Sequence, residues 1–398
     1  MESKNWNVYL FRDILERVEV PVNVESNKEY VQIGIRSHGK GLFYKEPVLG
    51  KALGNKQVFW IQPNCFILNV VFAWEQAITK TTEHEIGMIG SHRFPMYRPK
   101  NDLVDIDYLI YYFLTKRGTD ILEAASPGGA GRNRTLGQER FLKSKITLPT
   151  LPEQQKIAAI LSTQDKVIEL KEKLLVQKQQ QKKYLMQQLL TGKKRLPGFG
   201  GEWKTIHLNE ISCRIETKNT VGNSNVLTIS AQYGLINQTE FFDKVIASND
   251  KSNYYLLSKD EFAYNRSYSK GYPYGTIKRL KRYVQGVVSP LYICFAVNKK
   301  LASLDFLEQY FEASIINREI QSIVQEGARN HGMLNVAVDD FFRVKITMPE
   351  IEEQKEIAEI LSTADHEIDL LQKSIETEKQ KKKALMQLLL TGKVRVKI

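Results

Sequence analysis

Residues 145–196 read KITLPTLPEQQKIAAILSTQDKVIELKEKLLVQKQQQKKYLMQQLLTGKKRL, and residues 345–396 repeat them as KITMPEIEEQKEIAEILSTADHEIDLLQKSIETEKQKKKALMQLLLTGKVRV. About half of the aligned positions are identical, at a constant offset of 200 residues. After Pro149 and Pro152 in the first copy and Pro349 in the second, neither copy contains proline or glycine until Gly192 and Gly392. Because glycine commonly follows the last turn of a helix, each copy predicts one long helix, from about residue 152 to 190 in the first.

Apolar residues recur every seven positions in both predicted helices, which is typical of a seam between two supercoiled helices. The seam residues are Leu161, Ile168, Leu175, Leu361, Ile368 and Ile375. We expect the copies to pair with each other, antiparallel. Two alternatives stay open: the heptads could simply form core, or capping boxes at Ser162 and Ser362 could start a new helix after a short first one.

The far end of each predicted helix is densely apolar again. An apolar patch there needs a cover, either the chain's own globules or another chain. These residues are Leu185, Met186, Leu189 and Leu190 in the first copy and Leu385, Met386, Leu389 and Leu390 in the second.

The regions before the helices also align, in the same order. Trp6 matches Trp203, CFILN at 65–69 matches EFAYN at 261–265, Pro95 and Tyr97 match Pro290 and Tyr292, and GAGRN at 129–133 matches GARN at 327–330. The prediction is two copies of one unit: globule 1–144, spacer helix 145–196, globule 197–344 and spacer helix 345–398. Short β-branched and aromatic runs indicate strands, and one helix is expected near the end of each globule, at about 106–125 and 304–326. The fold class is therefore α+β, with two long antiparallel helices.

Composition limits the function classes. The chain has 398 residues and a net charge of +12, and residues 145–196 hold 11 basic against 4 acidic side chains. This excess favours a polyanionic partner. Cys65, Cys213 and Cys294 are far apart, and we expect them to be reduced core residues. No early apolar run resembles a signal peptide and no stretch of eighteen apolar residues occurs, so a cytoplasmic location is expected.

Several loops are rich in the side chains that contact phosphates and base edges. The candidates in the first globule are Arg36, Ser37, His38, Lys40, Ser91, His92, Arg93, Arg132, Asn133 and Arg134. Those in the second are Gln232, Tyr233, Asn265, Arg266, Ser267, Tyr268, Lys270, Lys278, Arg279, Lys281, Arg282, Arg329, Asn330 and His331. For any one of them, a solvated surface residue is an equal alternative. Two similar readers on a rod of about 58 Å would contact DNA sites at most about 17 base pairs apart.

The repeated PxxEQxxIAxILS pattern followed by LMQxLLTGK, each after a globule that opens with Trp, resembles the specificity (S) subunit of type I restriction-modification systems. The resemblance covers the whole chain. It implies two target recognition domains that read the halves of an asymmetric bipartite double-stranded DNA site, and two helices that act as spacer. It also implies partners: usually two modification subunits, which methylate adenine, and restriction subunits. S-adenosylmethionine, ATP and Mg are then expected on those partners, and the apolar ends of the two helices are where the family places partner contacts.

Catalytic motifs are not found, as the resemblance requires of a non-catalytic subunit. The chain has no adjacent prolines of the kind that adenine methyltransferases use, and GIRSHGKG at 34–41 puts Gly41 where a phosphate loop needs Ser or Thr. The histidines lack the spacing of metal ligands, so no metal and no cofactor are expected here. Two other classes remain: a nucleic-acid enzyme with an unrecognised active site, and a coiled-coil scaffold whose globules bind proteins.

Overall fold

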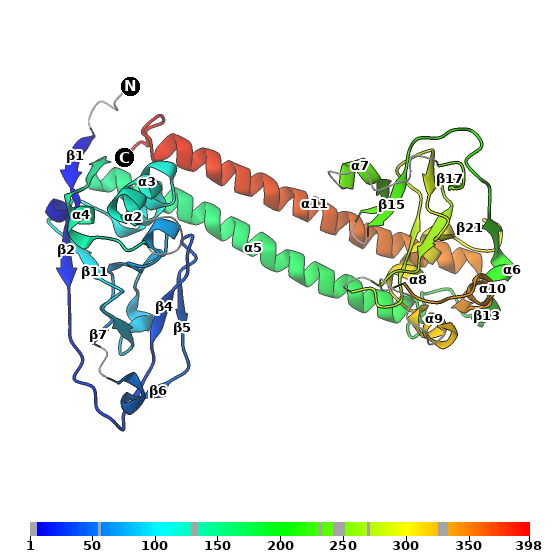
Figure 1. Ribbon diagram of the computed structural model, residues 1–398, viewed down its shortest axis with the longest axis horizontal. Helices are drawn as coiled ribbons and strands as arrows, with labels where there is room; N and C mark the ends of the chain where they lie inside the picture. The colour runs from blue at the N-terminus through cyan, green and yellow to red at the C-terminus, as the bar shows by residue number, and fades with distance from the viewer. Residues whose placement is uncertain are drawn as a thin grey trace. The chain divides into compact units, whose positions relative to one another are not determined.

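The computed structural model describes residues 6–54, 57–128, 134–230, 233–241, 251–268, 271–324 and 333–398. The chain divides into two compact units, Met1–Glu172 with Ser374–Ile398, and Lys173–Lys373. Two helices of 39 residues, α5 (Leu151–Leu189) and α11 (Ile351–Leu389), each begin in one unit and end in the other. Each unit thus holds one globule, the first part of the helix that follows it and the last part of the other long helix (Figure 1).

The first globule is built on a four-stranded antiparallel sheet in the order β2-β11-β8-β9. Short two-stranded pairs surround it, and β12 pairs with β1 directly before α5 begins. Its elements are β1 (Asn7–Leu10), α1 (Phe11–Ile14), β2 (Leu15–Val18), β3 (Glu29–Tyr30), β4 (Ile33–Ile35), β5 (Leu42–Tyr44), β6 (Val48–Leu49), η1 (Gly50–Leu53), β7 (Val58–Trp60), β8 (Phe66–Leu68), η2 (Ala73–Glu75), β9 (Ile78–Lys80), η3 (Glu83–Glu85), β10 (Ile89–Ser91), β11 (Met96–Pro99), α2 (Ile106–Phe113), α3 (Lys116–Ala125), α4 (Gln138–Lys143) and β12 (Lys145–Leu148).

The second globule repeats this plan, with a four-stranded antiparallel sheet in the order β14-β21-β18-β19. Its elements are β13 (Lys204–His207), α6 (Leu208–Ile211), β14 (Ser212–Ile215), β15 (Leu227–Ser230), β16 (Gly234–Asn237), α7 (Gln238–Phe241), β17 (Tyr255–Ser258), β18 (Phe262–Asn265), β19 (Thr276–Arg279), β20 (Gln285–Val288), β21 (Ile293–Val297), α8 (Leu304–Glu312), α9 (Asn317–Ile323), α10 (Val338–Phe342) and β22 (Lys345–Met348). The α+β class and the internal repeat are confirmed.

Strand register corrects one detail of the predicted alignment. Tyr97 lies opposite Phe66, and in the second sheet Phe295 lies opposite Phe262. The partner of Tyr97 in the repeat is therefore Phe295, and the match with Tyr292 was wrong. The proline and tyrosine that suggested it belong to the turn before β21, where sequence similarity does not fix the pairing of strands.

Each globule carries two short helices where one longer helix was expected. In the first, Thr115 caps α3 by accepting a hydrogen bond from the amide of Gly118. A side chain at Gly118 would lie 2.3 Å from the carbonyl oxygen of Tyr112, so glycine lets α3 turn back against α2. In the second, Ser314 adopts φ +59° after α8 and the chain restarts as α9. The hydrophobic pattern continues across both breaks, which is why the sequence suggested one helix.

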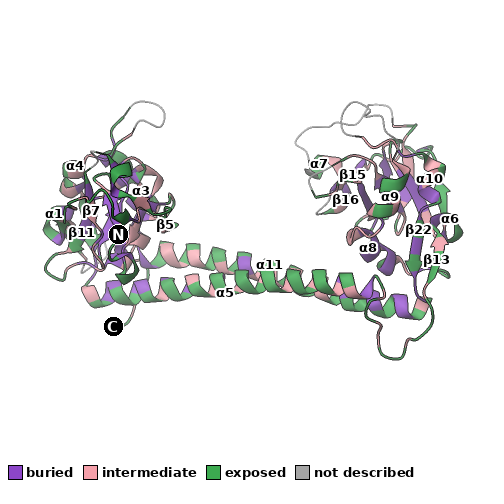
Figure 2. Cartoon of the chain, turned by 90° about the horizontal axis from the view of Figure 1, so that it is seen from below, coloured by how far each residue is buried: buried purple, intermediate pink, exposed green. Residues whose placement is uncertain are grey.

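The core of each globule includes parts of both long helices. In the first, Phe11, Phe66, Phe113 and Phe141 are fully buried among one another, and Leu161 of α5 joins the same cluster as Leu389, at the end of α11, and the following Leu390. In the second, Leu361 of α11 joins Met186 and Leu189 of α5 and the following Leu190. Figure 2 shows these buried positions where the helices meet each globule, and mostly exposed residues in between.

Polar contacts between the long helices show that they run antiparallel. In the first unit Asp165 pairs with Lys382 at 2.5 Å and Glu172 pairs with Lys379 at 2.7 Å. In the second unit Asp365 pairs with Lys182 at 2.5 Å and Glu367 pairs with Lys178 at 2.7 Å. Neither helix restarts at Ser162 or Ser362, so the interpretation with a break is wrong. Gly192 and Gly392 adopt φ +68° and +70° just beyond the helix ends, as predicted.

Two smaller expectations have different outcomes. Cys65 and Cys294 are buried, and burial raises the pKa of the Cys294 thiol to about 12. Cys213 is exposed, because it lies on the outward face of β14, so its assignment to the core was wrong.

Within the described ranges, no helix has the length and apolar character needed to cross a membrane.

Candidate nucleic-acid interface

Three of the predicted loops in the first globule meet at one turn, residues 70–76, which we call the central turn. The loop with Ser37 and His38 is tied to it: the hydroxyl of Ser37 donates to the Glu75 carboxylate at 3.0 Å, and the amide of His38 donates to the Glu75 carbonyl at 2.8 Å. The Arg93 carbonyl accepts from the amide of Val70 at 3.0 Å. The structure thus brings together candidates that lie far apart in sequence.

Arg134 reaches the same turn. Its guanidinium lies over the Trp74 ring, 5.4 Å from the centroid, which is a cation-π geometry. The amide of Leu136, two residues later, donates to the carbonyl of Val70 at 2.8 Å. Three candidate loops therefore contact one short segment of backbone, and one of them brings a cationic side chain, Arg134, to it.

The central turn is held by its own hydrogen bonds. The Asn69 side chain accepts from the amide of Val71 at 3.0 Å, and the Trp74 indole donates to the Val71 carbonyl at 3.1 Å. Ala73 is fully buried beneath the turn, whereas Phe72 is 37% exposed. A hydrogen-bonded turn that carries an exposed aromatic ring close to an arginine has the chemistry of a groove-reading element: a cation for phosphates and an apolar group for base edges.

The sequence analysis did not include the central turn. The signal was present in the two aromatic residues Phe72 and Trp74 shortly after the apolar strand β8, but aromatic residues after a strand usually continue a core. Of the predicted residues, Arg36 donates to the Leu42 carbonyl and lies over the Phe43 ring, which fixes its position. Lys40 and His92 are exposed. Ser91 accepts from the amide of Arg93 at 3.3 Å.

In the second globule, Arg266 has a structural role. Its guanidinium donates to the carbonyls of Leu291 and Val336 at 2.9 Å each. It therefore joins the loop after β18 to two other segments instead of facing solvent freely. Tyr268 is 63% exposed and Tyr233 is 62% exposed, so both rings are accessible. Asn265 accepts from the amide of Ser267 at 3.0 Å and shapes the loop between them.

The basic residues on and after β19 are mostly paired with acidic residues of α8. Arg279 is only 8% exposed and pairs with Asp305 at 2.6 Å and Glu308 at 3.0 Å. Lys278 pairs with Glu312, and Lys281 pairs with Glu308 at 3.2 Å. The charges of Lys278 and Arg279 are balanced by carboxylates of α8, and their contact with DNA stays a prediction. Lys281 and Arg282 keep exposed side chains, and Arg282 pairs with Glu240 at 3.1 Å.

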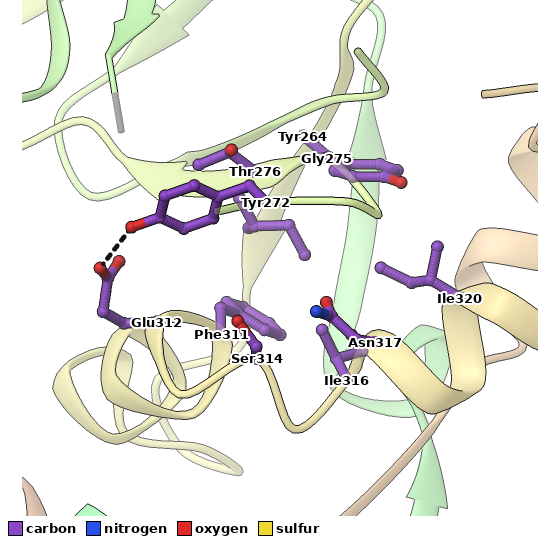
Figure 3. Close-up of a pocket in the computed structure, with 11 residues that line it drawn as sticks. Tyr264, Tyr272, Gly275, Thr276, Phe311, Glu312, Ser314, Ile316, Asn317 and Ile320 are labelled. Carbon is purple, nitrogen blue, oxygen red and sulfur yellow. Dashed lines mark hydrogen bonds between the residues drawn. The ribbon is translucent and has the colours of Figure 1, made fainter. Parts of the chain in front are cut away.

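A small cavity lies between this sheet and the connection from α8 to α9. Figure 3 shows Tyr272 donating to Glu312 at its edge, at 3.0 Å, with Asn317, Ile316 and Ile320 on the other side. The Tyr272 pKa is raised to about 12 by burial and by the neighbouring Glu312 carboxylate. Its free volume of about 10 Å³ has room for no more than one water molecule, so it is no ligand site.

The apolar ends of the long helices are covered by the chain itself. Leu189, Leu190, Leu389 and Leu390 are at most 4% exposed, and Met186 is 9% exposed. Leu185, Leu385 and Met386 pack against the same cores and are half-buried. The globules thus cover most of the surface of the buried members, and the expected partner contact stays a prediction. Of the predicted seam residues, Leu161 and Leu361 are fully buried, Ile168 and Ile375 are nearly so, and Leu175 and Ile368 are half-buried.

Some candidates lie outside the described residues: Arg132, Asn133, Gln232, Lys270, Arg329, Asn330 and His331. In the ranges that the structure describes, no cluster of His, Cys, Asp and Glu has the arrangement of a metal site.

Comparison with known proteins gives matches along nearly the whole chain. The family model for the type I restriction modification DNA specificity domain matches residues 29–180 and 201–379. The putative type I restriction enzyme MjaX specificity subunit of Methanocaldococcus jannaschii is 24% identical over 437 residues, covering 99% of this chain and 95% of the relative. The MjaVIII specificity subunit of the same organism is 25% identical over 327 residues, 75% of this chain and 72% of the relative.

Solved structures share the fold. The HsdS subunit from Thermoanaerobacter tengcongensis superposes with a TM-score of 0.56 at 17% identity, covering 99% of this chain and 98% of the other. The S subunit of a type I restriction-modification system from M. genitalium gives a TM-score of 0.55 at 12% identity, covering 97% and 96%. A chain from a study of complex assembly in the type I R-M system gives 0.58 at 16% identity, covering 99% and 100%.

Proposed function

The chain belongs to the type I restriction-modification DNA specificity family, and on this premise we propose that its two globules read the two unlike halves of one bipartite DNA site. Members of the family are the non-catalytic DNA-recognition components of their systems. The chemistry therefore falls to other chains.

The internal repeat carries the proposal. Both globules use the same four-stranded sheet order and the same strand pair before a long helix. Their loops differ: the first gathers Arg93, Arg134 and His38 at the central turn, whereas the second offers Tyr233 and Tyr268. One scaffold with two loop sets supports two readers with different base preferences, and hence an asymmetric site.

The long helices support a spacer role. A helix of 39 residues is about 58 Å long, which sets an upper bound of about 17 base pairs on the distance between half-sites. The ion pairs between α5 and α11 recur at equivalent places in both units, so the helices are matched to each other. We assign them the role of fixing the half-site spacing.

The partners that fit this role are two modification subunits, which would methylate adenine with S-adenosylmethionine, and restriction subunits that would use ATP and Mg for translocation and cleavage. Such complexes act on the DNA of the cell, so the proposed location is the cytoplasm.

Methylome sequencing of cells that carry this chain and its modification subunit tests the proposal. The wild-type pair is expected to protect one bipartite sequence. Exchanging residues 1–144 for those of another specificity chain should change one half-site, and exchanging residues 197–344 should change the other. Unaltered specificity after both exchanges contradicts the proposal, as does methylation or cleavage by this chain alone.

A further inference from the structure

A basic groove lies in the first unit between the start of α3 and the last turns of α11. It has a volume of about 780 Å³. Leu114, Met386 and Leu390 line it with apolar surface. The cations that line it are Lys116, Arg117, Lys379, Lys382 and Lys383. We call this set the basic groove.

The charges of the basic groove are only partly compensated. Lys382 pairs with Asp165, Lys379 with Glu172, and Lys116 with Asp120. Among the described residues, neither Arg117 nor Lys383 has a carboxylate within ion-pair distance, and both are exposed. The positive end of the α3 dipole adds to this field, because Thr115 caps that helix beside the groove. The groove therefore carries a net positive charge.

One end of the basic groove leads to the central turn. His38, from a candidate loop, and Gln76, from the central turn, both line it. Gln76 is fixed there by a hydrogen bond from its side chain to the hydroxyl of Thr119 at 2.5 Å. The anion-binding surface is thus continuous with the proposed base-reading surface.

The second unit repeats only part of these charges. By the offset of the long helices, Lys182 and Lys183 correspond to Lys382 and Lys383, whereas Gln179 stands in place of Lys379. Ser314 and Ile315 stand where the first unit has Lys116 and Arg117. If the groove bound modification subunits, two like subunits would need the same surface in both units. A contact to the DNA beside one half-site is needed in one unit only, which fits a groove whose charges are not fully repeated.

We propose that the basic groove binds backbone phosphates of the DNA that flanks the half-site read by the first globule. The proposal rests on the proposed function. Arg117 and Lys383 hold phosphates without reading bases, so they strengthen binding to any sequence and orient the duplex toward the central turn.

The test uses the complex with its modification subunit and the variant Arg117→Gln/Lys383→Gln. Binding to a duplex with the recognised site and to a scrambled duplex is measured between 50 and 200 mM NaCl. The slope of log K against log[salt] is negative, and loss of two phosphate contacts should make it shallower by about 1.8. At 0.1 M salt this corresponds to a loss of about 60-fold in affinity. The loss should be the same for both duplexes, and the methylated sequence should not change.

The control Lys143→Gln/Lys183→Gln removes the same charge outside the basic groove and should keep the wild-type slope. An unchanged slope in the Arg117/Lys383 variant overturns the proposal. If sedimentation shows that this variant fails to assemble with the modification subunit, the groove is a protein-docking surface and the proposal is wrong. If the wild-type complex binds the recognised and the scrambled duplex equally well, the proposed function is contradicted. The groove is still tested in that case, because its phosphate contacts should act on the scrambled duplex as well.

Discussion

Glu153 and Gln154 are identical in both copies because they anchor each long helix to its globule. Both side chains are fully buried. The Gln154 side chain accepts from the amide of Asp105 and donates to the carbonyls of Leu103 and Pro149, all at 2.9 Å. Glu153 accepts two hydrogen bonds from Arg395 at 2.6 Å, and Glu353 pairs in the same way with Arg195. The repeated dipeptide is thus structural.

Gln154→Ala should lower the free energy of unfolding of the first unit by about 2–4 kcal/mol, because it leaves one amide and two carbonyls in a buried site without partners. The control Gln155→Ala changes the next, exposed residue and should stay within about 0.5 kcal/mol of wild type. Thermal and urea unfolding of the two variants measure this. Equal stability of the two would show that water replaces the amide at no cost.

Phe72→Ala should relax specificity in one half-site. The ring is exposed at the central turn, so its removal would take away the proposed base contact and little of the core. A loss of about 1–3 kcal/mol per contacted base pair corresponds to a fall of about 5- to 150-fold in discrimination there. Methylome sequencing would detect extra methylated sites that differ at that half alone. Ile86→Ala, an exposed residue of the same globule, is the control, and a site unchanged in both variants would remove the central turn from base reading.

At the scale of the element, the two long helices are held by polar contacts as much as by apolar ones. Gln164 and Lys171 of α5 both donate to the Glu378 carboxylate of α11, at 2.7 and 2.9 Å. The hydrogen bond from Lys171, followed by that from Gln164, lowers the pKa of Glu378 to about 2. The heptad pattern alone did not indicate this cluster, since it forms between residues more than 200 positions apart.

The lowered pKa gives a prediction for pH dependence. A carboxylate whose folded-state pKa is depressed stabilises the fold above its ordinary value near 4.5, and this contribution is lost as pH falls toward 2. Glu378→Gln should therefore lower the Tm at pH 6, and the difference from wild type should vanish near pH 2. Glu376→Gln on the exposed face of the same helix is the control. A Tm difference that is equal at both pH values would contradict the assigned role of Glu378.

At the scale of the whole molecule, the proposed spacer role predicts how the recognised site responds to helix length. Inserting one heptad after residue 172 and another before residue 374 keeps the helical phase and adds about 10.5 Å to each helix. The gap between the half-sites should then grow by about 3 base pairs, with the same bases read on each side. Methylome sequencing measures both the gap between the half-sites and the bases on each side of it.

A heptad inserted in α5 alone should shift Asp165 and Lys182 out of register with their partners and lower the yield of active complex. An unchanged gap after the double insertion would mean that the helices do not set the spacing.

The sequence by itself determined the repeat, the length and direction of the long helices, the α+β class and the family, because each depends on local periodicity or on direct comparison of one half with the other. Only the tertiary structure decided which side chains remain exposed or without an ion-pair partner, and so can contact DNA or another chain. It gathered His38, Arg93 and Arg134 at the central turn, and it set the carboxylates of α8 against Lys278 and Arg279. It also covered Leu190 and Leu390 with the globules. Charge pairing and burial depend on residues brought together from distant parts of the chain, and no local pattern encodes which carboxylate will meet which cation.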